Sequence, residues 1–233
     1  MLGHPGRHRA RRGAVPLAIF TLLDEQVVSY AVVIAGLIVG GALGAFLATK
    51  VEMTQMPELV AAMHSLVGLA AVFVGFIAHI ELGRVMAMDD SAKKALEGFA
   101  ALLAKKDSVE IAILRVELFL GVFIGAVTFT GSVIAYGKLA GKVDTSAKKL
   151  PGGHILNAGA AALSVLCLIW YFNTGGVFPL ILMTAAALFI GYHLIMGIGG
   201  ADMPVVVSML NSYSGWAAAA IGFSLGNDLL IVV

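Results

Sequence analysis

The sequence predicts an all-α fold, a polytopic transmembrane helical bundle with about six full spans. Of its 233 residues, 60% are hydrophobic and only 12% are charged, whereas a soluble domain carries about 25% charged residues. The charges are also clustered, which leaves several apolar windows of about 18 residues or more, each long enough to cross a bilayer as a helix. We therefore expect the lipid bilayer to surround most of the chain. The net charge of +1 indicates no nucleic-acid partner.

The apolar windows predict six spans, and turn residues mark their ends. We expect them at residues 27–49, 57–80, 114–137, 155–172, 177–197 and 203–223. Pro57, Pro179 and Pro204 each lie in the first turn of a span, where the missing N–H costs little. A further apolar run begins near residue 228, and as a helix it would rise only about 9 Å against a hydrocarbon core of about 30 Å. We expect that last span to be truncated.

Residues 1–26 form an atypical basic N-terminus. Arg7, Arg9, Arg11 and Arg12 precede a short apolar run at residues 14–23, as in a signal peptide, but no small-residue cleavage site follows. The run is too short to cross a bilayer. We expect it to be the remnant of an earlier span.

Two connections carry most of the remaining charge. The segment 81–113 places apolar residues at helical spacing between flanking lysines, which predicts an amphipathic helix that serves as a lid or spacer. Its apolar positions are Ala92, Ala95, Leu96, Phe99, Leu102 and Leu103. The loop 138–149 is basic and poor in acids, so we place that side of the bundle in the cytoplasm.

Three spans carry small and polar residues at intervals of three or four, so each set lies on one helix face. Facing one another, these faces would leave room for ordered water among polar side chains. A fourth set, the glycines at 36, 40 and 44, predicts close helix packing alone. The three sets are His64, Gly68, Ala71 and Gly75; Gly121, Gly125, Thr128 and Ser132; and Ser208, Asn211, Ser212 and Gly215.

His64 is the strongest candidate for a functional residue. It lies about 10 Å into its helix, counted from Pro57, and an ionisable side chain at such a depth is costly and by default functional. Histidine is also the side chain that gains and loses a proton nearest to neutral pH. The alternative is a neutral histidine that bonds to a helix carbonyl and has only a structural role.

The other polar candidates each have a structural alternative. Asn211 can hold a water or bond to His64, but asparagine also joins helices. Serine and threonine at positions such as Ser132 and Thr128 often bond back to their own helix. Asp202 precedes a helix start, where an acid can act as a cap or a partner of the helix dipole. No soluble catalytic motif and no Cys–His metal cluster is present, so we expect no catalytic and no metal-binding residues in this chain.

Four segments closely resemble the beta subunits of proton-translocating nicotinamide nucleotide transhydrogenases. They are residues 50–59 (KVEMTQMPEL), 64–71 (HSLVGLAA), 125–132 (GAVTFTGS) and 199–216 (GGADMPVVVSMLNSYSGW). The last is long and highly specific. The resemblance runs from about residue 28 to residue 233, apart from the segment 81–113, which is enlarged here.

The resemblance implies a set of roles for these residues. This family moves a hydride between NADH and NADP and couples the transfer to proton movement across the membrane. His64 and Asn211 match the family's proton-pathway histidine and asparagine, and Ser132 matches a serine on an adjacent pathway helix. Asp202 matches an acidic residue at the cytoplasmic mouth, near the nucleotide domain. The predicted pathway is completed by two hydroxyls on the same helix faces, Thr128 and Ser208.

The resemblance also implies partners and cofactors. Residues 27–233 would form the transmembrane proton-channel domain of the beta subunit, and we expect the C-terminal NADP-binding domain to be absent. No cofactor would then bind to this chain, while NAD(H) and NADP(H) would bind to the complete complex. The expected partners are the alpha subunit, the NADP-binding domain, a second copy in a homodimeric assembly and the lipid bilayer of the bacterial inner membrane.

Two other readings remain open. A small-solute transporter or channel that shares a buried histidine would predict internal repeats, and none is evident in the sequence. A structural or nonfunctional membrane fragment would predict that His64 and Asn211 point at lipid or at backbone, and not at each other.

Overall fold

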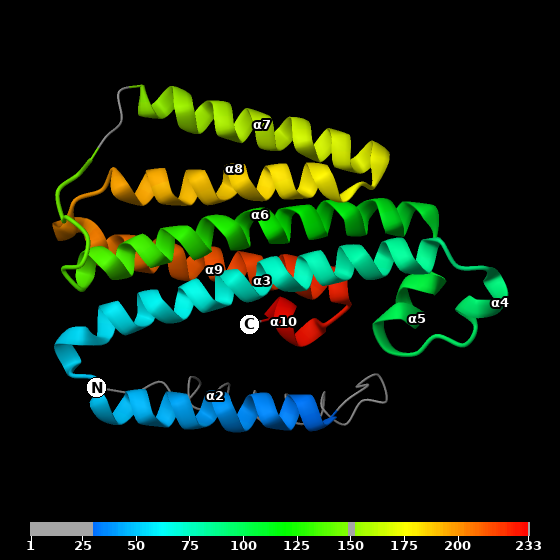
Figure 1. The fold of residues 1–233 in the computed structure, drawn as a ribbon, viewed down its shortest axis with the longest axis horizontal. Helices are drawn as coiled ribbons and strands as arrows, with labels where there is room; N and C mark the ends of the chain where they lie inside the picture. The colour runs from blue at the N-terminus through cyan, green and yellow to red at the C-terminus, as the bar shows by residue number, and fades with distance from the viewer. Residues whose placement is uncertain (1–29, 149–151, 233) are drawn as a thin grey trace, which may run out of the picture. The chain divides into compact units, whose positions relative to one another are not determined.

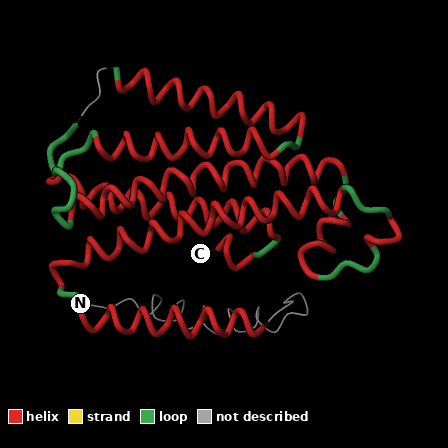
Figure 2. Tube along the Cα trace, in the orientation of Figure 1, coloured by secondary structure: helices red, strands yellow, loops and turns green. Residues whose placement is uncertain are grey.

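A computed structural model describes residues 30–148 and 152–232, and within these ranges every regular element is a helix. Figure 1 and Figure 2 show the helices and the short connections between them. The all-α prediction is therefore confirmed. The prediction for the basic segment 1–26 lies outside the described residues.

The chain divides into two compact units, residues 1–50 with 88–105, and residues 51–87 with 106–233. The described helices of the first unit are α2 (Tyr30–Lys50), α4 (Asp90–Lys93) and α5 (Gly98–Lys105). Those of the second unit are α3 (Met56–Met86), α6 (Ser108–Leu139), α7 (Gly153–Thr174), α8 (Val177–Met196), α9 (Met203–Leu225) and α10 (Asp228–Val232), with two 3₁₀ turns, η1 (Met53–Gln55) and η2 (Gly200–Asp202).

All six predicted spans coincide with helices. Four helical segments of the described chain are long and apolar enough to cross a membrane, namely Met53–Met86, Ser108–Leu139, Gly153–Thr174 and Val177–Met196. At the two other predicted positions lie α2, with 21 residues, and α9, with 23 residues. Four of the predicted spans therefore have the length and composition of membrane-crossing helices, and the crossing by α2 and α9 stays a prediction. Two of the prolines lie where expected, since Pro57 is the second residue of α3 and Pro204 is the second residue of α9.

The connection predicted at 81–113 is shorter than expected. Helix α3 continues to Met86, and α6 already begins at Ser108. A reciprocal capping box fixes that start, because the Asp107 carboxylate accepts from the Glu110 N–H at 2.8 Å and the Glu110 carboxylate accepts from the Asp107 N–H at 2.9 Å. In place of one amphipathic helix the structure has two short helices, α4 and α5. Gly98, with φ of 61°, begins the second in a conformation that glycine adopts easily.

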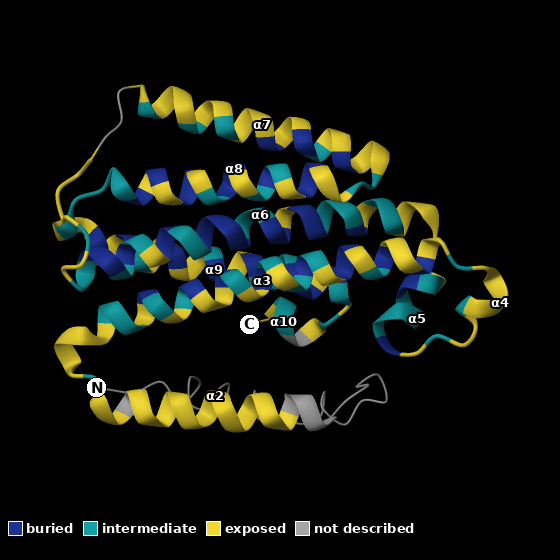
Figure 3. Ribbon diagram, in the orientation of Figure 1, coloured by how far each residue is buried: buried dark blue, intermediate teal, exposed yellow. Residues whose placement is uncertain are grey.

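Helix α6 is the centre of the second unit and packs against α3, α8 and α9, while α7 packs mainly on α8 (Figure 1). Its position is reflected in its burial, since 61% of the apolar window of α6 is buried but only 17% of that of α7 (Figure 3). One core cluster joins α6 to α7 and α8 through Val122, Cys167 and Met183. The apolar outer face of α7, with Ile155, Leu166 and Ile169, is by contrast exposed.

Helices α3 and α6 touch backbone to backbone. A Cβ atom added at Gly68 would lie 2.7 Å from both the Gly125 carbonyl oxygen and the Phe129 nitrogen, and one added at Gly125 would lie 2.9 Å from the Ala71 Cβ. These distances leave space only for glycine. The small-residue faces predicted on these two helices are therefore their contact faces, as expected where small residues let membrane helices approach closely.

We predict that Gly68→Ala lowers the stability of the chain by about 1–3 kcal/mol, because the added methyl meets rigid backbone. Gly83→Ala on the same helix is the matched control, since nothing lies within 4 Å of a Cβ there, and removing a helical glycine favours stability by up to about 1 kcal/mol. Thermal unfolding can be followed with a maleimide dye, because Cys167 is the only cysteine and is buried. Equal melting temperatures for the two variants would contradict the close contact.

Candidate functional site

A hydrogen bond between two predicted site residues joins α3 to α9. His64 Nε2 lies 2.8 Å from Asn211 Oδ1, across 147 residues of sequence. His64 is half-buried and lies about 12 Å along α3 from Met56, at 1.5 Å per residue. The two side chains therefore point at each other, as the hydrated-pathway reading expects, and the same bond joins α3 to α9, as a structural asparagine would.

This bond assigns distinct roles to the two ring nitrogens of His64. The amide oxygen of Asn211 can only accept, so Nε2 carries the hydrogen and donates it, and Nδ1 keeps the lone pair of the neutral ring. Nδ1 is buried and has no hydrogen-bond partner within residues 30–148 and 152–232. The nitrogen that keeps the lone pair is thus the buried one.

Ser132 on α6 lies at the same level as His64. The antiparallel contact of α3 with α6 runs from Gly75 against Val122 to Gly68 against Phe129. Continued by one helical turn, this register puts His64 opposite Ser132. Ser132 follows Gly125 by two turns on the same face, so its side chain points toward the same seam.

The contact of α6 with α9 leads to the same level. A Cβ at Gly121 would lie 2.8 Å from Ile221 Cδ1, and one at Gly131 would lie 3.1 Å from Leu210 Cδ2. This register is also antiparallel and places Asn211, the neighbour of Leu210, level with Gly131. Three helices therefore bring His64, Asn211 and Ser132 to one depth in the bundle.

Ser132 supplies a second unpartnered polar atom at this depth. Ser132 is 0% exposed, and its Oγ forms no hydrogen bond in the described part of the chain. A buried polar atom without a partner costs about 1–3 kcal/mol, and native proteins usually satisfy such atoms with ordered water. The Oγ of Ser132 and the Nδ1 of His64 are thus suited to hold water between the three helices.

The remaining predicted residues are placed differently. The Thr128 hydroxyl donates to the Ile124 carbonyl at 2.7 Å, back to its own helix. Ser208 is exposed on α9. Asp202 is also exposed; it precedes α9, and its side chain forms no cap hydrogen bond there.

The expectation that all three polar faces meet in one seam is wrong for α9. Ser208, Asn211 and Gly215 are exposed, and Asn211 alone reaches across to α3. The buried face of α9 is mainly apolar and packs on α6 and α3. It consists of Met203, Val206, Leu210, Ser214, Ala217, Ile221, Gly222 and Ser224. Because the larger apolar side chains occupy the contact, the polar face is rotated toward the outside.

Lys138 is a buried cation that sequence reasoning treated only as a marker of the helix exit. Its side chain is buried, and Nζ donates to the carbonyls of Ser146 at 3.3 Å, Met196 at 3.1 Å and Ile198 at 2.6 Å. All three ammonium hydrogens are therefore used. The carbonyl of Met196 ends α8, where a cation also stabilises the helix dipole. The signal in the sequence was a lysine placed inside the helical run and not after it.

The loop held by Lys138 is also ordered by its own polar groups. The Gly200 N–H donates to the Thr145 carbonyl at 2.9 Å, which ties the loop to the turn before α9. Hydrogen bonds from Ser146 and Lys148 lower the pKa of Asp144 to about 2. The loop is thus fastened to the segment that contains Asp202.

We predict that Lys138→Met destabilises the chain by about 1.5–3 kcal/mol, because three carbonyl groups lose a charged donor. Lys142→Met is the matched control, since Lys142 is exposed and its ammonium group contacts Tyr136, to whose hydroxyl it donates; it should cost under about 0.5 kcal/mol. Dye-monitored unfolding and tryptic cleavage after Lys148 give the two readouts. Similar behaviour of both variants would show that Lys138 does not hold the loop.

Fold and site together define a class of protein. It is a helical membrane protein in which a histidine inside one helix, His64, is hydrogen-bonded to an asparagine of another helix, Asn211. Comparison with known families makes this specific. The profile of the family described as "NAD(P) transhydrogenase beta subunit" matches residues 8–233. The chain belongs to this family, which confirms the resemblance predicted from the four segments. The match begins earlier than residue 28, where those segments placed it.

Two curated relatives give the same result. Both are named "NAD(P) transhydrogenase subunit beta", one from Rhodospirillum rubrum and one from a specified strain of that species, and each is 43% identical over 229 residues. The alignment covers 97% of this chain and 46% of each relative. The chain therefore spans about half the length of the curated relatives that it matches.

Proposed function

We propose that this chain is the membrane, proton-translocating part of a nicotinamide nucleotide transhydrogenase. That enzyme transfers a hydride between NADH and NADP⁺ and couples the transfer to proton movement. Family membership supports the reaction. The observation that carries the proton role is the His64–Asn211 bond, which leaves one buried ring nitrogen free to accept a proton.

His64 is the proton carrier in this proposal. Asn211 accepts from Nε2 in both charge states of the ring, so it fixes the ring while the proton moves at Nδ1. A water held by the Ser132 hydroxyl delivers or removes that proton. Thr128 keeps a lone pair that can accept from a further water, and Ser208 continues the polar surface toward the start of α9.

The packing around the carrier supports access from one side at a time. On the side of His64 away from the start of α3, the seam is closed by the contact of Gly68 with Gly125 and by the apolar cluster of Ala71, Ala217 and Ile221. A water chain does not fit through backbone in direct contact. His64 then exchanges its proton with the side where α3 begins, which we call the near side. A shift of α3 against α6 exposes it to the opposite, far side. Nucleotide binding elsewhere in the complex sets which side is open.

The coupling partners lie on the near side in this proposal. The basic loop 138–149 supports a cytoplasmic position for this side in a bacterium, with the chain in the inner membrane. Asp202, exposed before α9 and beside the fastened loop, is the contact to the NADP(H)-binding domain. NAD(H) binds to the alpha subunit, no cofactor binds to this chain, and the complex is a homodimer. A solute transporter would instead need a polar cavity in the seam that the glycine contacts close.

We predict that His64→Ala lowers hydride-driven proton pumping by about 100-fold, because it removes the titrating group. Pumping is measured with a pH-sensitive dye in liposomes that contain the complete complex. Met63→Ala is the control, since the neighbouring Met63 is 50% exposed and points away from the seam. Pumping by the His64 variant at the level of the control would rule out His64 as the carrier.

We predict a smaller but distinct effect for Ser132→Ala, about a tenfold loss of pumping, because a buried hydroxyl without a partner is removed from the water path. Thr128→Val should reduce pumping less, since the Thr128 hydroxyl is committed to the Ile124 carbonyl. The comparison uses the same liposomes and includes the melting temperature of each variant. A larger loss for Thr128→Val than for Ser132→Ala would contradict the assignment of the water to Ser132.

A further inference from the structure

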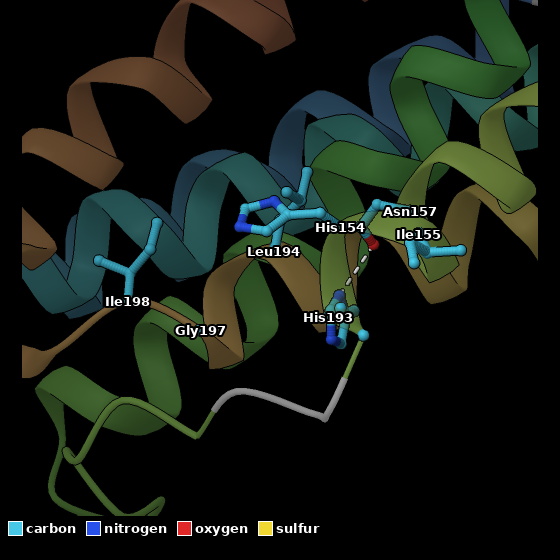
Figure 4. Close-up of a pocket in the computed structure, with 9 residues that line it drawn as sticks. His154, Ile155, Asn157, His193, Leu194, Gly197 and Ile198 are labelled. Carbon is cyan, nitrogen blue, oxygen red and sulfur yellow. Dashed lines mark hydrogen bonds between the residues drawn. The ribbon is translucent and has the colours of Figure 1, made fainter.

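A second polar pair lies beside a cavity of about 570 Å³ between the start of α7 and the end of α8 (Figure 4). It is independent of the proton site, because none of its residues lies in the seam of α3, α6 and α9. The cavity is lined by His154, Ile155, Asn157, His193, Leu194 and Ile198, with glycines at the flanking turns. Most of the wall is therefore apolar, with a few polar groups at one end.

The ring of His193 is fixed and carries an unpartnered acceptor. Its Nδ1 lies 2.8 Å from Asn157 Oδ1 (Figure 4), so Nδ1 donates and Nε2 keeps the lone pair. Phe189 stacks on the ring with an interplanar angle of 8°. His193 is only 6% exposed, and its Nε2 has no hydrogen-bond partner among the residues described. A buried acceptor of this kind requires a donor.

The free edge of the ring faces the start of α7. A Cβ at Gly153, the first residue of α7, would lie 2.8 Å from His193 Cε1 and 3.2 Å from Nε2. The Ile155 N–H already donates to the Gly152 carbonyl at 2.9 Å, so the N–H groups of Gly153 and His154 are the ones at this helix start that, with the helix dipole, favour a phosphate. An anion-binding helix start and a buried acceptor thus lie side by side at the rim of one apolar cavity.

We propose that this cavity binds a glycerophospholipid whose headgroup ends in a hydrogen-bond donor. The phosphate is held by the first N–H groups of α7, and the terminal hydroxyl or ammonium donates to His193 Nε2. The acyl chains lie along the apolar wall formed by Ile155, Leu194 and Ile198. The position supports a lipid, because α7 and α8 both have the length and composition of membrane spans and the cavity lies at their shared end.

The donor requirement makes the site selective among lipids. Phosphatidylglycerol ends in hydroxyl groups and phosphatidylethanolamine in an ammonium group, and both can donate to Nε2. Phosphatidylcholine has the same phosphate but no N–H or O–H at its end. Native mass spectrometry of the full chain, titrated with each lipid, should show about tenfold tighter binding of the first two, the effect of one hydrogen bond to a buried group.

The double variant His193→Phe with Asn157→Leu tests the site itself. It removes both polar partners together, which can leave stability nearly unchanged, so its melting temperature in phosphatidylcholine should equal that of the unchanged chain. Its preference for donor lipids should fall about tenfold. Asn173→Leu, near the other end of α7, is the matched control and should keep the preference. If the double variant unfolds, Gly153→Ala replaces it, because the added methyl presses on the ring edge and blocks the same approach.

Three results would overturn the proposal. The first is equal affinity for all three lipids, and the second is an unchanged preference in the cavity variants. The third is equal binding of inorganic phosphate or glycerol 3-phosphate at the same concentration, which would define a soluble anion site. Hydride-driven pumping is measured separately, so a failure of the lipid site leaves the proposed role of His64 unaffected.

Discussion

The close contact of α3 with α6 is the constraint on which the rest of the second unit depends. In lipid no hydrophobic force draws apolar helices together, so they associate through packing of small residues and through polar contacts. Gly68 and Gly125 let the two backbones touch. This contact sets the register that brings Ser132 level with His64, and α9 lies against the same pair of helices with Asn211 in reach of the ring.

The contact of α3 with α6 also affects the path that a proton could take through the bundle. Polar atoms gather on one side of it, and apolar side chains fill the seam on the other, where Val122 meets Gly75 and Ile221 meets Gly121. A closely packed apolar seam contains no partner for a proton or for water. The structural contact and the proposed barrier are therefore one feature, and movement of α3 against α6 would change both together.

Lys138, His64 and His193 differ in how completely their hydrogen bonds are satisfied. Lys138 donates to three carbonyls and uses every hydrogen of its ammonium group, which suits a structural fastening. His64 and His193 each have one ring nitrogen bonded to an asparagine and one without a partner in the described chain. An incompletely satisfied buried group is costly. The two histidines are for that reason the residues to which we assign the proposed proton and ligand, and Lys138 is not.

The sequence by itself determined the helices, because the length of an apolar run and the position of a proline act locally. It placed His64 inside a helix, identified the glycine faces of α3 and α6, and identified the family. It did not determine the rotation of α9, the three acceptors of Lys138, the His193–Asn157 pair or the division of the segment after α3. The pair and most of the Lys138 acceptors depend on contacts between residues well apart in the chain, 36 positions for His193 and Asn157 and 60 for Lys138 and Ile198. Helical spacing reveals which residues share a face, but only packing against neighbouring helices decides what that face meets.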